Sequence, residues 1–370
     1  MTKMTFAIFA HSWTSDWNHG NAHFLRGLAH ELMNLGHSVR CYEPVNSWSR
    51  KNLQAEGWGV GDWALQQFQA KFSHLDVRFY AADEHFSEYA SAELRGVDVV
   101  IVHEWNSPDV VNTIAALKEK LGFIALFHDT HHRAYTEPLE ISKFNIRDFD
   151  GVLAFGDAIR QIYIEAFDVS RAWVFHEAAD TAHFYPMPAR KNTDIVWVGN
   201  WGDEERTQEL EEYLIGPASR VNARVAVHGV RYPKSAQARL KEAGIEYRGY
   251  LPNLQAPQTY AQSLITLHVP RRFYTNGLSG VPTIRVFEAL ACGIPLLCSP
   301  WSDTEGLFTP GLDYVCVRNS EAMTTEIGHF LKDEKAREQL SQRGLQTIRE
   351  RHTCGHRARE LQAICEELAR

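Results

Sequence analysis

Short apolar runs alternate with longer amphipathic segments along almost the whole chain. At the start, residues 6–10 are apolar and predict a buried strand, and apolar side chains then recur at helical spacing from Ala22 to Leu35, just before Gly36. Strands that alternate with helices in this way are typical of parallel sheets with helices on both faces. The pattern therefore predicts an α/β fold.

The apolar runs fall into two groups separated by a polar stretch that contains prolines. The expected strands are residues 6–10, 38–42, 97–103, 123–127, 152–155 and 172–175 in the first group, and residues 195–198, 224–228, 246–250, 265–269, 296–299 and 314–317 in the second. Pro186, Pro188 and the polar residues 190–192 lie between the groups, as is typical of a connection between domains. Each group predicts one Rossmann-like, doubly wound sheet.

The chain of 370 residues is long enough for two domains that each bury a core without disulfides. We expect residues 1–187 to form the first domain and residues 193–350 the second, with the two facing a central cleft. Residues 321–370 have the pattern of three helices, and the last part, residues 351–370, is expected to pack back on the first domain.

The composition disfavours several classes of protein. The net charge is −8 at pH 7 and charges of both signs are interspersed, so the chain lacks the basic face that attracts nucleic acid or an anionic membrane. Six cysteines without CxxC spacing, and a start without the pattern of a secretory signal, indicate a reduced, cytoplasmic protein. Because no apolar stretch approaches the roughly 20 residues of a membrane-spanning helix, no transmembrane segment is expected.

The most informative segment places one carboxylate, Glu288, inside an apolar helix that begins after Pro282. The amides at the start of this helix, near Thr283 and Ile284, can donate to phosphate oxygens, and Arg285 adds a positive charge one helical turn before Glu288. The segment therefore predicts a phosphate and ribose site. The alternative is that Glu288 occupies an ordinary exposed helix position.

Further candidate phosphate ligands follow predicted strands. Arg271 and Arg272 come after residues 265–269, at the carboxyl end where ligands gather in open α/β sheets, although arginine pairs are also common on solvated loops. Asn200 follows another predicted strand and can donate a hydrogen bond, while Gly20 allows the backbone to approach a phosphate closely.

A second polar group, His128, Asp129, His131 and His132, follows residues 123–127. These side chains suit hydrogen bonds to sugar hydroxyls or to charge that develops during a reaction. They are also metal-ligand types, but adjacent residues of one loop rarely all reach one ion, so we expect no metal.

The loop after the first predicted strand offers groups for an acceptor. Asn18 and Asn21 can donate hydrogen bonds, and Trp13 and Trp17 carry aromatic faces that suit the apolar side of a sugar ring. The alternative for these tryptophans is a place in the hydrophobic core.

Several segments occur in the order and spacing of one known family, namely residues 18–22, 26–32, 36–39, 177–186 and 288–295. On these residues, nearly the whole chain resembles a GT-B glycosyltransferase of the family 4 group, and more closely the bacterial glycosyltransferases of the spore-maturation type. The resemblance implies transfer of a sugar from a nucleoside-diphosphate sugar, such as a UDP or GDP sugar, without metal or cofactor.

The resemblance also implies roles for individual residues. Glu288 would accept hydrogen bonds from the ribose diol, and Tyr250, after Gly249, would stack on the base. His128 and Asp129 resemble the catalytic His-Asp step, and His132 would lie on the acceptor side.

Two departures from the family pattern leave alternatives open. Many relatives carry an acid eight positions before the residue matched to Glu288, where this chain has Gly280, and many carry an Arg-Lys pair where residues 199–206 are largely acidic. The alternatives are a sugar-nucleotide epimerase or hydrolase, and a catalytically silent protein that binds a nucleotide sugar. The absence of a G-x-G-x-x-G motif after residues 6–10 disfavours a dinucleotide dehydrogenase. The base, the sugar, the stereochemistry and the acceptor, whether glycan, lipid, protein or small metabolite, stay open.

Overall fold

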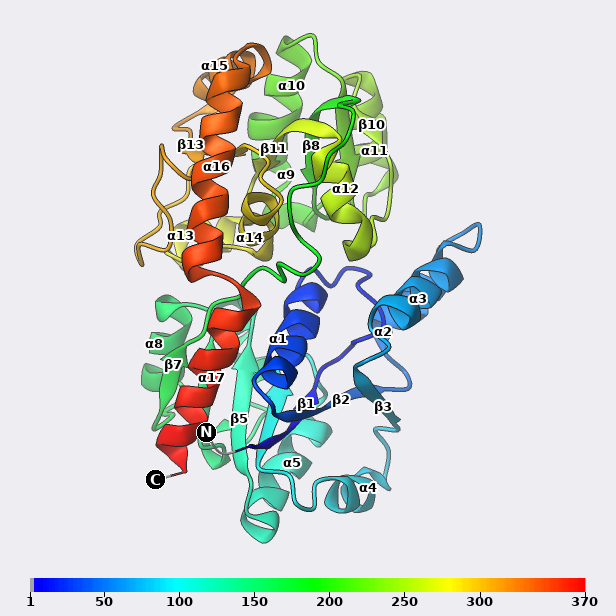
Figure 1. Cartoon of the computed structure of the whole chain (residues 1–370), viewed down its shortest axis with the longest axis vertical. Helices are drawn as coiled ribbons and strands as arrows, with labels where there is room; N and C mark the ends of the chain where they lie inside the picture. Colours follow the sequence, from blue (N-terminus) through cyan, green and yellow to red (C-terminus); the bar gives the residue numbers. More distant parts are fainter. Residues whose placement is uncertain (1–2, 370) are drawn as a thin grey trace. The chain divides into compact units, whose positions relative to one another are not determined.

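The computed structural model describes residues 3–369, without the side chain of Asp203, and the chain forms two compact units. The first unit combines the chain up to Glu177 with the segment from Cys354 onward, and the second comprises Ala178–Thr353. In Figure 1 the first unit runs from blue to green and includes the red helix α17 (Cys354–Leu368). Contacts between α1 (Ala22–Asn34) and α17 join the two ends of the chain within this unit.

The first unit is built on a parallel sheet. Within residues 3–369 this sheet has seven strands in the order β3-β2-β1-β4-β5-β6-β7. The strands are β1 (Thr5–Phe9), β2 (Ser38–Pro44), β3 (Asp76–Tyr80), β4 (Val99–His103), β5 (Ile124–Asp129), β6 (Gly151–Ala154) and β7 (Ala172–Val174). Phe6 of β1 pairs with Val39 of β2 on one side and with Val99 of β4 on the other. The strand order therefore reverses between β1 and β4, which is the topological switch point of this sheet.

The helices of the first unit connect these strands. Besides α1 and α17 they are α2 (Trp48–Ala55), α3 (Val60–Lys71), α4 (Phe86–Glu93), α5 (Pro108–Leu121), α6 (Arg133–Thr136), α7 (Pro138–Ile141) and α8 (Asp157–Glu165). Every residue of β4 and of β6 is buried, as expected for central strands covered by helices on both faces.

The second unit repeats this architecture with a sheet of six parallel strands, counted within the described residues, in the order β10-β9-β8-β11-β12-β13. The strands are β8 (Thr193–Val198), β9 (Val225–His228), β10 (Glu246–Tyr247), β11 (Ser263–His268), β12 (Leu296–Cys298) and β13 (Val315–Cys316). The switch point of this sheet lies between β8 and β11, because β8 pairs with β9 on one side and β11 on the other.

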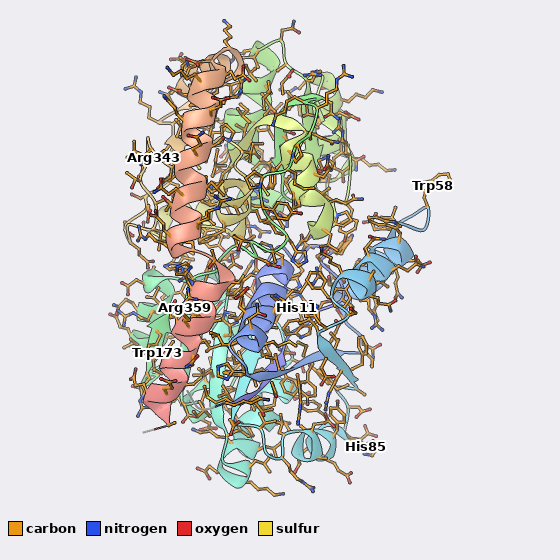
Figure 2. The ribbon with its side chains drawn as sticks, in the orientation of Figure 1. His11, Trp58, His85, Trp173, Arg343 and Arg359 are labelled. Atoms are coloured by element: carbon orange, nitrogen blue, oxygen red, sulfur yellow. The ribbon has the colours of Figure 1, made fainter. Side chains whose placement is uncertain are left out.

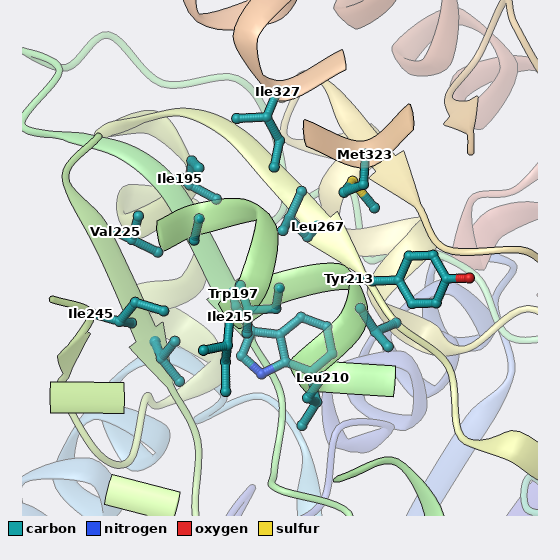
Figure 3. Close-up of a cluster of buried hydrophobic side chains, with 14 of the residues drawn as sticks. Ile195, Trp197, Leu210, Tyr213, Ile215, Val225, Ile245, Leu267, Met323 and Ile327 are labelled. Atoms are coloured by element: carbon teal, nitrogen blue, oxygen red, sulfur yellow. The ribbon is translucent and has the colours of Figure 1, made fainter. Parts of the chain in front are cut away.

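The helices of the second unit pack on both faces of its sheet. They are α9 (Thr207–Leu210), α10 (Gly216–Arg220), α11 (Lys234–Glu242), α12 (Ala256–Ala261), α13 (Arg272–Asn276), α14 (Ile284–Ala291), α15 (Ser320–Lys332) and α16 (Glu334–Arg351). One core cluster includes Ile195 and Trp197 of β8, Leu267 of β11, and Met323 and Ile327 of α15, all buried (Figure 3).

The predicted α/β class and twelve predicted strands are confirmed, and one strand of the first unit was missed. β3 has exposed or half-buried residues at four of its five positions, so it lacks the apolar run that marked the other strands. The predicted strand 246–250 is shorter than expected, because β10 ends at Tyr247 and Tyr250 lies in the following loop. The three helices expected in residues 321–370 are α15, α16 and α17.

Across residues 3–369, we find no helix with both the length and the apolar character that crossing a membrane requires.

Candidate functional site

Polar side chains gather at the switch point of the second sheet. Asn200 follows β8, and Arg271 follows β11, so both lie at the carboxyl edge where the strand order reverses. A hydrogen bond of 3.4 Å from Arg271 Nη2 to Asn200 Oδ1 confirms that the two loops meet. In open α/β sheets this is the place where ligands bind.

Arg206 joins the same two loops and was missed by the sequence analysis. Its Nη1 donates to the carbonyl of Val269 at 3.2 Å, and its Nη2 donates to the carbonyl and side-chain oxygens of Asn200 at 2.6 and 2.5 Å. The guanidinium also lies over the ring of Trp197. Its position in the segment after β8 could have predicted it, but most charged residues of that segment are acidic.

The guanidinium of Arg206 is buried beside other cations. Burial lowers its pKa to about 9, and the positive charges of Arg271 and Arg285 contribute in the same direction. The group still carries its charge at neutral pH. Three guanidinium groups therefore gather near the switch point of the second sheet. Arg271 and Arg285 are each paired with a carboxylate, so Arg206 supplies the positive charge in excess that favours an anionic ligand.

The two arginines predicted after β11 differ in their surroundings. Arg271 forms an ion pair with Glu205 and is largely buried, whereas Arg272 is 42% exposed and donates to Glu209 at 2.8 Å. Arg271 alone of the two contacts Asn200 and influences Arg206. The geometry therefore favours Arg271 over Arg272 as a ligand of an anion at the switch point.

Helix α14 begins beside the same edge. The hydroxyl of Thr283, which precedes the helix, lies 3.0 Å from Nε2 of His268 at the end of β11. Burial lowers the pKa of His268 to about 3, so its ring is neutral at pH 7. The contact fixes the start of α14 at the carboxyl end of β11, so the amide of Ile284 lies at this edge, where a helix start favours anions.

Glu288 is fully buried within α14. Its carboxylate pairs with Arg285 one turn earlier and lies near the hydroxyl of Tyr260. Glu288 therefore does not occupy an exposed helix position. Its predicted contact with a ribose diol stays a prediction.

Gly280 occupies the position where an acid was expected by resemblance. Its φ is +87°, and its amide donates to the carbonyl of Ser302 at 2.9 Å. A Cβ atom at this position would lie 2.4 Å from Oγ1 of Thr304. The local backbone therefore favours glycine for two independent reasons, the left-handed conformation and the lack of space.

Tyr250 lies at the same edge of the sheet, two strands from β8. The preceding Gly249 has φ +71°, and its carbonyl accepts a hydrogen bond of 2.8 Å from the amide of Gly229, which follows β9. This bond holds Tyr250, which is half-buried, in the loop after β10. Its stacking on a base stays a prediction.

The first unit carries a cluster of histidines at its own switch point. The rings of His11 and His19 have centroids 3.9 Å apart, those of His11 and His103 5.7 Å, and those of His103 and His128 5.4 Å. His11 follows β1 and is labelled in Figure 2, while His103 ends β4. The sequence analysis found only His128, although the ends of the two neighbouring strands were a signal for His11 and His103.

Burial keeps these rings neutral. It lowers the pKa of His11 to about 4 and that of His128 to about 3, and it lowers the pKa values of His19 and His103 well below their usual range. The ring of His128 also packs edge-on against Phe24 and Phe175. Neutral imidazoles can accept protons or hydrogen bonds, but at pH 7 they add no positive charge.

Asp129 is buried in a hydrogen-bond network. It accepts bonds from the hydroxyl of Tyr163 at 2.6 Å and from the amide of His131 at 2.8 Å, and it lies beside the carboxyl group of Glu104. Burial raises the pKa of both carboxyl groups, and the charge of Asp129 raises that of Glu104 further, well above its usual range. The surroundings of this buried pair therefore favour the protonated carboxyl form, and the sequence analysis missed Glu104.

The remaining histidines of this loop contact neighbouring side chains. His132 Nδ1 lies 2.9 Å from the hydroxyl of Thr136, one turn later in α6. Among the residues that the structure describes, no group of three or more His, Cys, Asp or Glu side chains is arranged to hold a metal ion.

The two tryptophans predicted for an acceptor site lie inside the first unit. Trp13 is fully buried and donates its indole N–H to the carbonyl of Tyr42 at 3.2 Å, and Trp17 is 8% exposed and donates to Glu56 at 2.6 Å. The rings therefore contribute to the core, which corrects the expectation that they face an acceptor. Trp105, two residues after the end of β4, is 42% exposed, and the guanidinium of Arg133 packs 4.6 Å from the centre of its ring.

The polar loop before α1 lies close to the loop after β5. Asn21 precedes α1, and its side-chain nitrogen is 3.5 Å from the carbonyl of Thr130, while Asn18 adopts a positive φ of 50°. The structure thus brings Asn18, Gly20 and Asn21 to the carboxyl edge of the first sheet, near the histidine cluster.

Comparison with known proteins identifies the fold. The family model described as "Glycosyl transferase-like" matches residues 206–363. No curated protein sequence gives a significant match.

Solved structures resemble the chain over its length. A glycosyltransferase from Rickettsia africae ESF-5 has a TM-score of 0.68 at 12% identity and covers 100% of both chains. Anabaena Alr3699/HepE in complex with UDP and glucose has a TM-score of 0.70 at 12% identity, covering 98% of this chain and 100% of that one. Sucrose-phosphate synthase from Thermosynechococcus elongatus has a TM-score of 0.65 at 13% identity, covering 99% of each. At such identities the likeness shows the fold, which is GT-B, with one Rossmann-like unit in each half of the chain.

Proposed function

We propose that the protein is a glycosyltransferase whose second unit binds a nucleoside-diphosphate sugar. The observation that carries the proposal is the group of cations at the switch point of the second sheet, where Arg206 and Arg271 meet Asn200 beside the start of α14. A diphosphate carries about two negative charges, which helix-start amides and buried guanidinium groups recognise together.

The similar structures support this donor class. Anabaena HepE has been solved with UDP and glucose, and with UDP-glucose, and the matched family model spans the segment from Arg206 through α14. We infer a nucleoside diphosphate as the donor, with uracil as the first base to test. We also propose that the protein is a hexosyltransferase and that it belongs to the family 4 group, of the spore-maturation type.

The proposed reaction needs no metal. The acceptor oxygen attacks the anomeric carbon, the bond from that carbon to the diphosphate breaks, and the leaving diphosphate takes the electron pair. Arg271 and the start of α14 would stabilise the charge that develops on the diphosphate. The acceptor proton would pass to a base at the switch point of the first sheet. Burial lowers the pKa of His11 to about 4 and that of His128 to about 3, so these rings accept a hydrogen bond from the acceptor hydroxyl more readily than they take its proton.

The acceptor is proposed to bind at the switch point of the first sheet. The polar loop before α1, the histidine cluster and the exposed ring of Trp105 lie at that edge. His128 and Asp129 keep their predicted catalytic roles as a hypothesis. Both are buried, and so are their neighbours His103 and Glu104.

A ligand screen followed by a turnover assay tests the proposal. UDP, GDP, ADP and dTDP would each be added at saturation to the full chain, and binding at 100 times the dissociation constant should stabilise the fold by about 2.7 kcal/mol. Release of nucleoside diphosphate from the matching sugar nucleotide, dependent on an acceptor, would support transfer. Turnover without an acceptor would favour an epimerase or hydrolase, binding without turnover would favour a silent binding protein, and no response to any nucleotide would contradict the proposal.

A further inference from the structure

Two exposed tryptophans come from the strands on either side of the histidine cluster in the first unit. Trp48 begins α2, which follows β2, and Trp105 follows β4, while His11 of the cluster follows β1. In the sheet, β1 lies between β2 and β4. Neighbouring strands lie about 4.8 Å apart, so β2 and β4 are separated by about 10 Å. This span is wider than a single sugar ring.

Contacts between rings connect the two tryptophans to the cluster. The ring centroids of Trp105 and His11 are 6.3 Å apart, and those of His11 and His19 are 3.9 Å apart. On the other side, Trp48 packs against Trp17 in a T-shaped arrangement with centroids 5.0 Å apart, and Trp17 lies two residues before His19. Trp48, the histidine cluster and Trp105 thus form an aromatic row at the carboxyl edge of the first sheet.

Both tryptophans of the aromatic row are exposed, although the backbone that carries Trp48 is anchored. Trp48 is 53% exposed and Trp105 is 42% exposed. The hydroxyl of Ser49 donates to the carbonyl of Trp17 at 2.7 Å, which fixes the start of α2 to the loop after β1. Two large rings held in water forgo the burial that stabilises a core, and exposed apolar area beside a polar cluster is typical of a binding surface.

Between the two tryptophans, the cluster offers a polar atom to a ligand. Within residues 3–369, Nδ1 of His11 is buried and has no hydrogen-bond partner, which costs free energy unless a ligand or a water molecule supplies the bond. The cation that packs on Trp105, Arg133, is paired with Glu137 at 3.3 Å and with Glu104 at 3.7 Å, so its charge is compensated. The aromatic row therefore favours a neutral ligand over an anionic one.

A sugar ring fits these groups, because one face of a pyranose consists of C–H groups and its rim carries hydroxyls. Aromatic faces pack on the first, and an imidazole nitrogen binds the second. We propose that the acceptor is a neutral oligosaccharide whose sugar rings pack on Trp48 and Trp105 and whose reacting hydroxyl lies at the histidine cluster. The inference rests on the proposed function and names the chemical class of its acceptor. The bond changes are those of the transfer described above, with a sugar hydroxyl as the attacking oxygen.

An array of neutral oligosaccharides, applied to the full chain without a sugar nucleotide and followed by calorimetry, tests the inference. At least one series should bind, with an affinity that rises tenfold or more from the monosaccharide to the trisaccharide. Trp48→Ala and Trp105→Ala should each weaken trisaccharide binding at least tenfold and leave nucleoside-diphosphate binding within twofold. Trp58→Ala is the matched control and should change neither constant, because Trp58 lies fully exposed in the turn between α2 and α3 (Figure 2).

Trp48→Phe separates ring stacking from an effect on the fold. It keeps an aromatic face and should retain trisaccharide binding within threefold. If a wild-type protein that binds a nucleotide bound no oligosaccharide of the array, the inference would be overturned and the proposed function would stand. Equal losses in Trp48→Ala and Trp58→Ala, or binding to phosphatidylglycerol vesicles that requires Trp48, would also overturn it. Failure to bind any nucleotide, with oligosaccharide binding intact, would overturn the proposed function and the acceptor role of the bound sugar.

Discussion

The three arginines at the second switch point differ in burial and in their partners. Arg206 is buried and bonded to both loops, Arg271 is largely buried beside it, and Arg272 is half in solvent with its own acidic partner. An exposed ion pair contributes little to binding, whereas a guanidinium in a buried cluster keeps most of its interaction with an anion. The three arginines should therefore respond differently to substitution.

Arg271→Gln should weaken nucleoside-diphosphate binding about tenfold or more, because a charge-assisted hydrogen bond contributes about 1.5 to 3 kcal/mol. Arg272→Gln, one residue away, is the matched control and should change the affinity less than twofold. Titration calorimetry with UDP would measure both. Equal losses in the two variants would show that general positive charge, rather than the position of Arg271, determines binding.

Gly280→Ala should destabilise the second unit more than Gly306→Ala. Both glycines have a positive φ, +87° and +64°, but only at Gly280 does a Cβ meet another atom, at 2.4 Å. The conformation alone costs about 1 kcal/mol, and the clash should add to it. Urea denaturation compares the variants, and equal costs would show that the Thr304 side chain moves aside freely.

His128→Phe should flatten the dependence of stability on pH. The imidazole pKa is about 3 in the folded protein against 6.5 as the ordinary value, so the unfolded chain binds one more proton between pH 6.5 and 3. Stability therefore falls as the pH is lowered through this window. In the variant, the unfolding free energy should change with pH less steeply, by about 1.4 kcal/mol per pH unit. Urea denaturation from pH 4.5 to 6.5 would measure this slope. An unchanged slope would contradict the buried neutral imidazole.

At the scale of elements, the helix at the end of the chain completes the first unit. α17 packs against α1, and Arg357 Nε donates to the carbonyl of His176 at 2.8 Å. Leu361 of α17 is fully buried, whereas Glu367 lies on the exposed face of the helix. The stability of the first unit should therefore depend on the buried face of α17.

Leu361→Ala should destabilise the protein by about 2 to 5 kcal/mol, the range for large-to-small changes in a core. Glu367→Ala on the same helix should cost less than about 0.5 kcal/mol, because exposed substitutions rarely matter. Thermal unfolding would compare the two variants. Similar midpoints would show that α17 contributes little to the fold.

The strands were predictable where burial on both faces made them apolar, as in β4, and were missed where it did not, as in β3. The site was predictable in outline because strand ends and helix starts are visible in sequence. Arg206 and Glu104 were not, since their surroundings are formed by residues distant along the chain. The prediction for Trp13 was wrong because the sequence does not distinguish an aromatic ring in a polar loop after a strand from a ring in the core.

At the scale of the whole molecule, two sheets of the same design each place polar groups at their own switch point. The first gathers neutral imidazoles and a carboxyl pair, and the second gathers guanidinium groups beside a helix start. This division matches a reaction in which one partner must lose a proton and the other must release an anion.

A crystal structure of the full chain with bound UDP tests the central claim most directly. We predict that the diphosphate lies within hydrogen-bonding distance of Arg271 and of the amide of Ile284, at the carboxyl edge between β8 and β11. A diphosphate bound elsewhere on the chain, or no bound nucleotide at saturating concentration, would contradict the account.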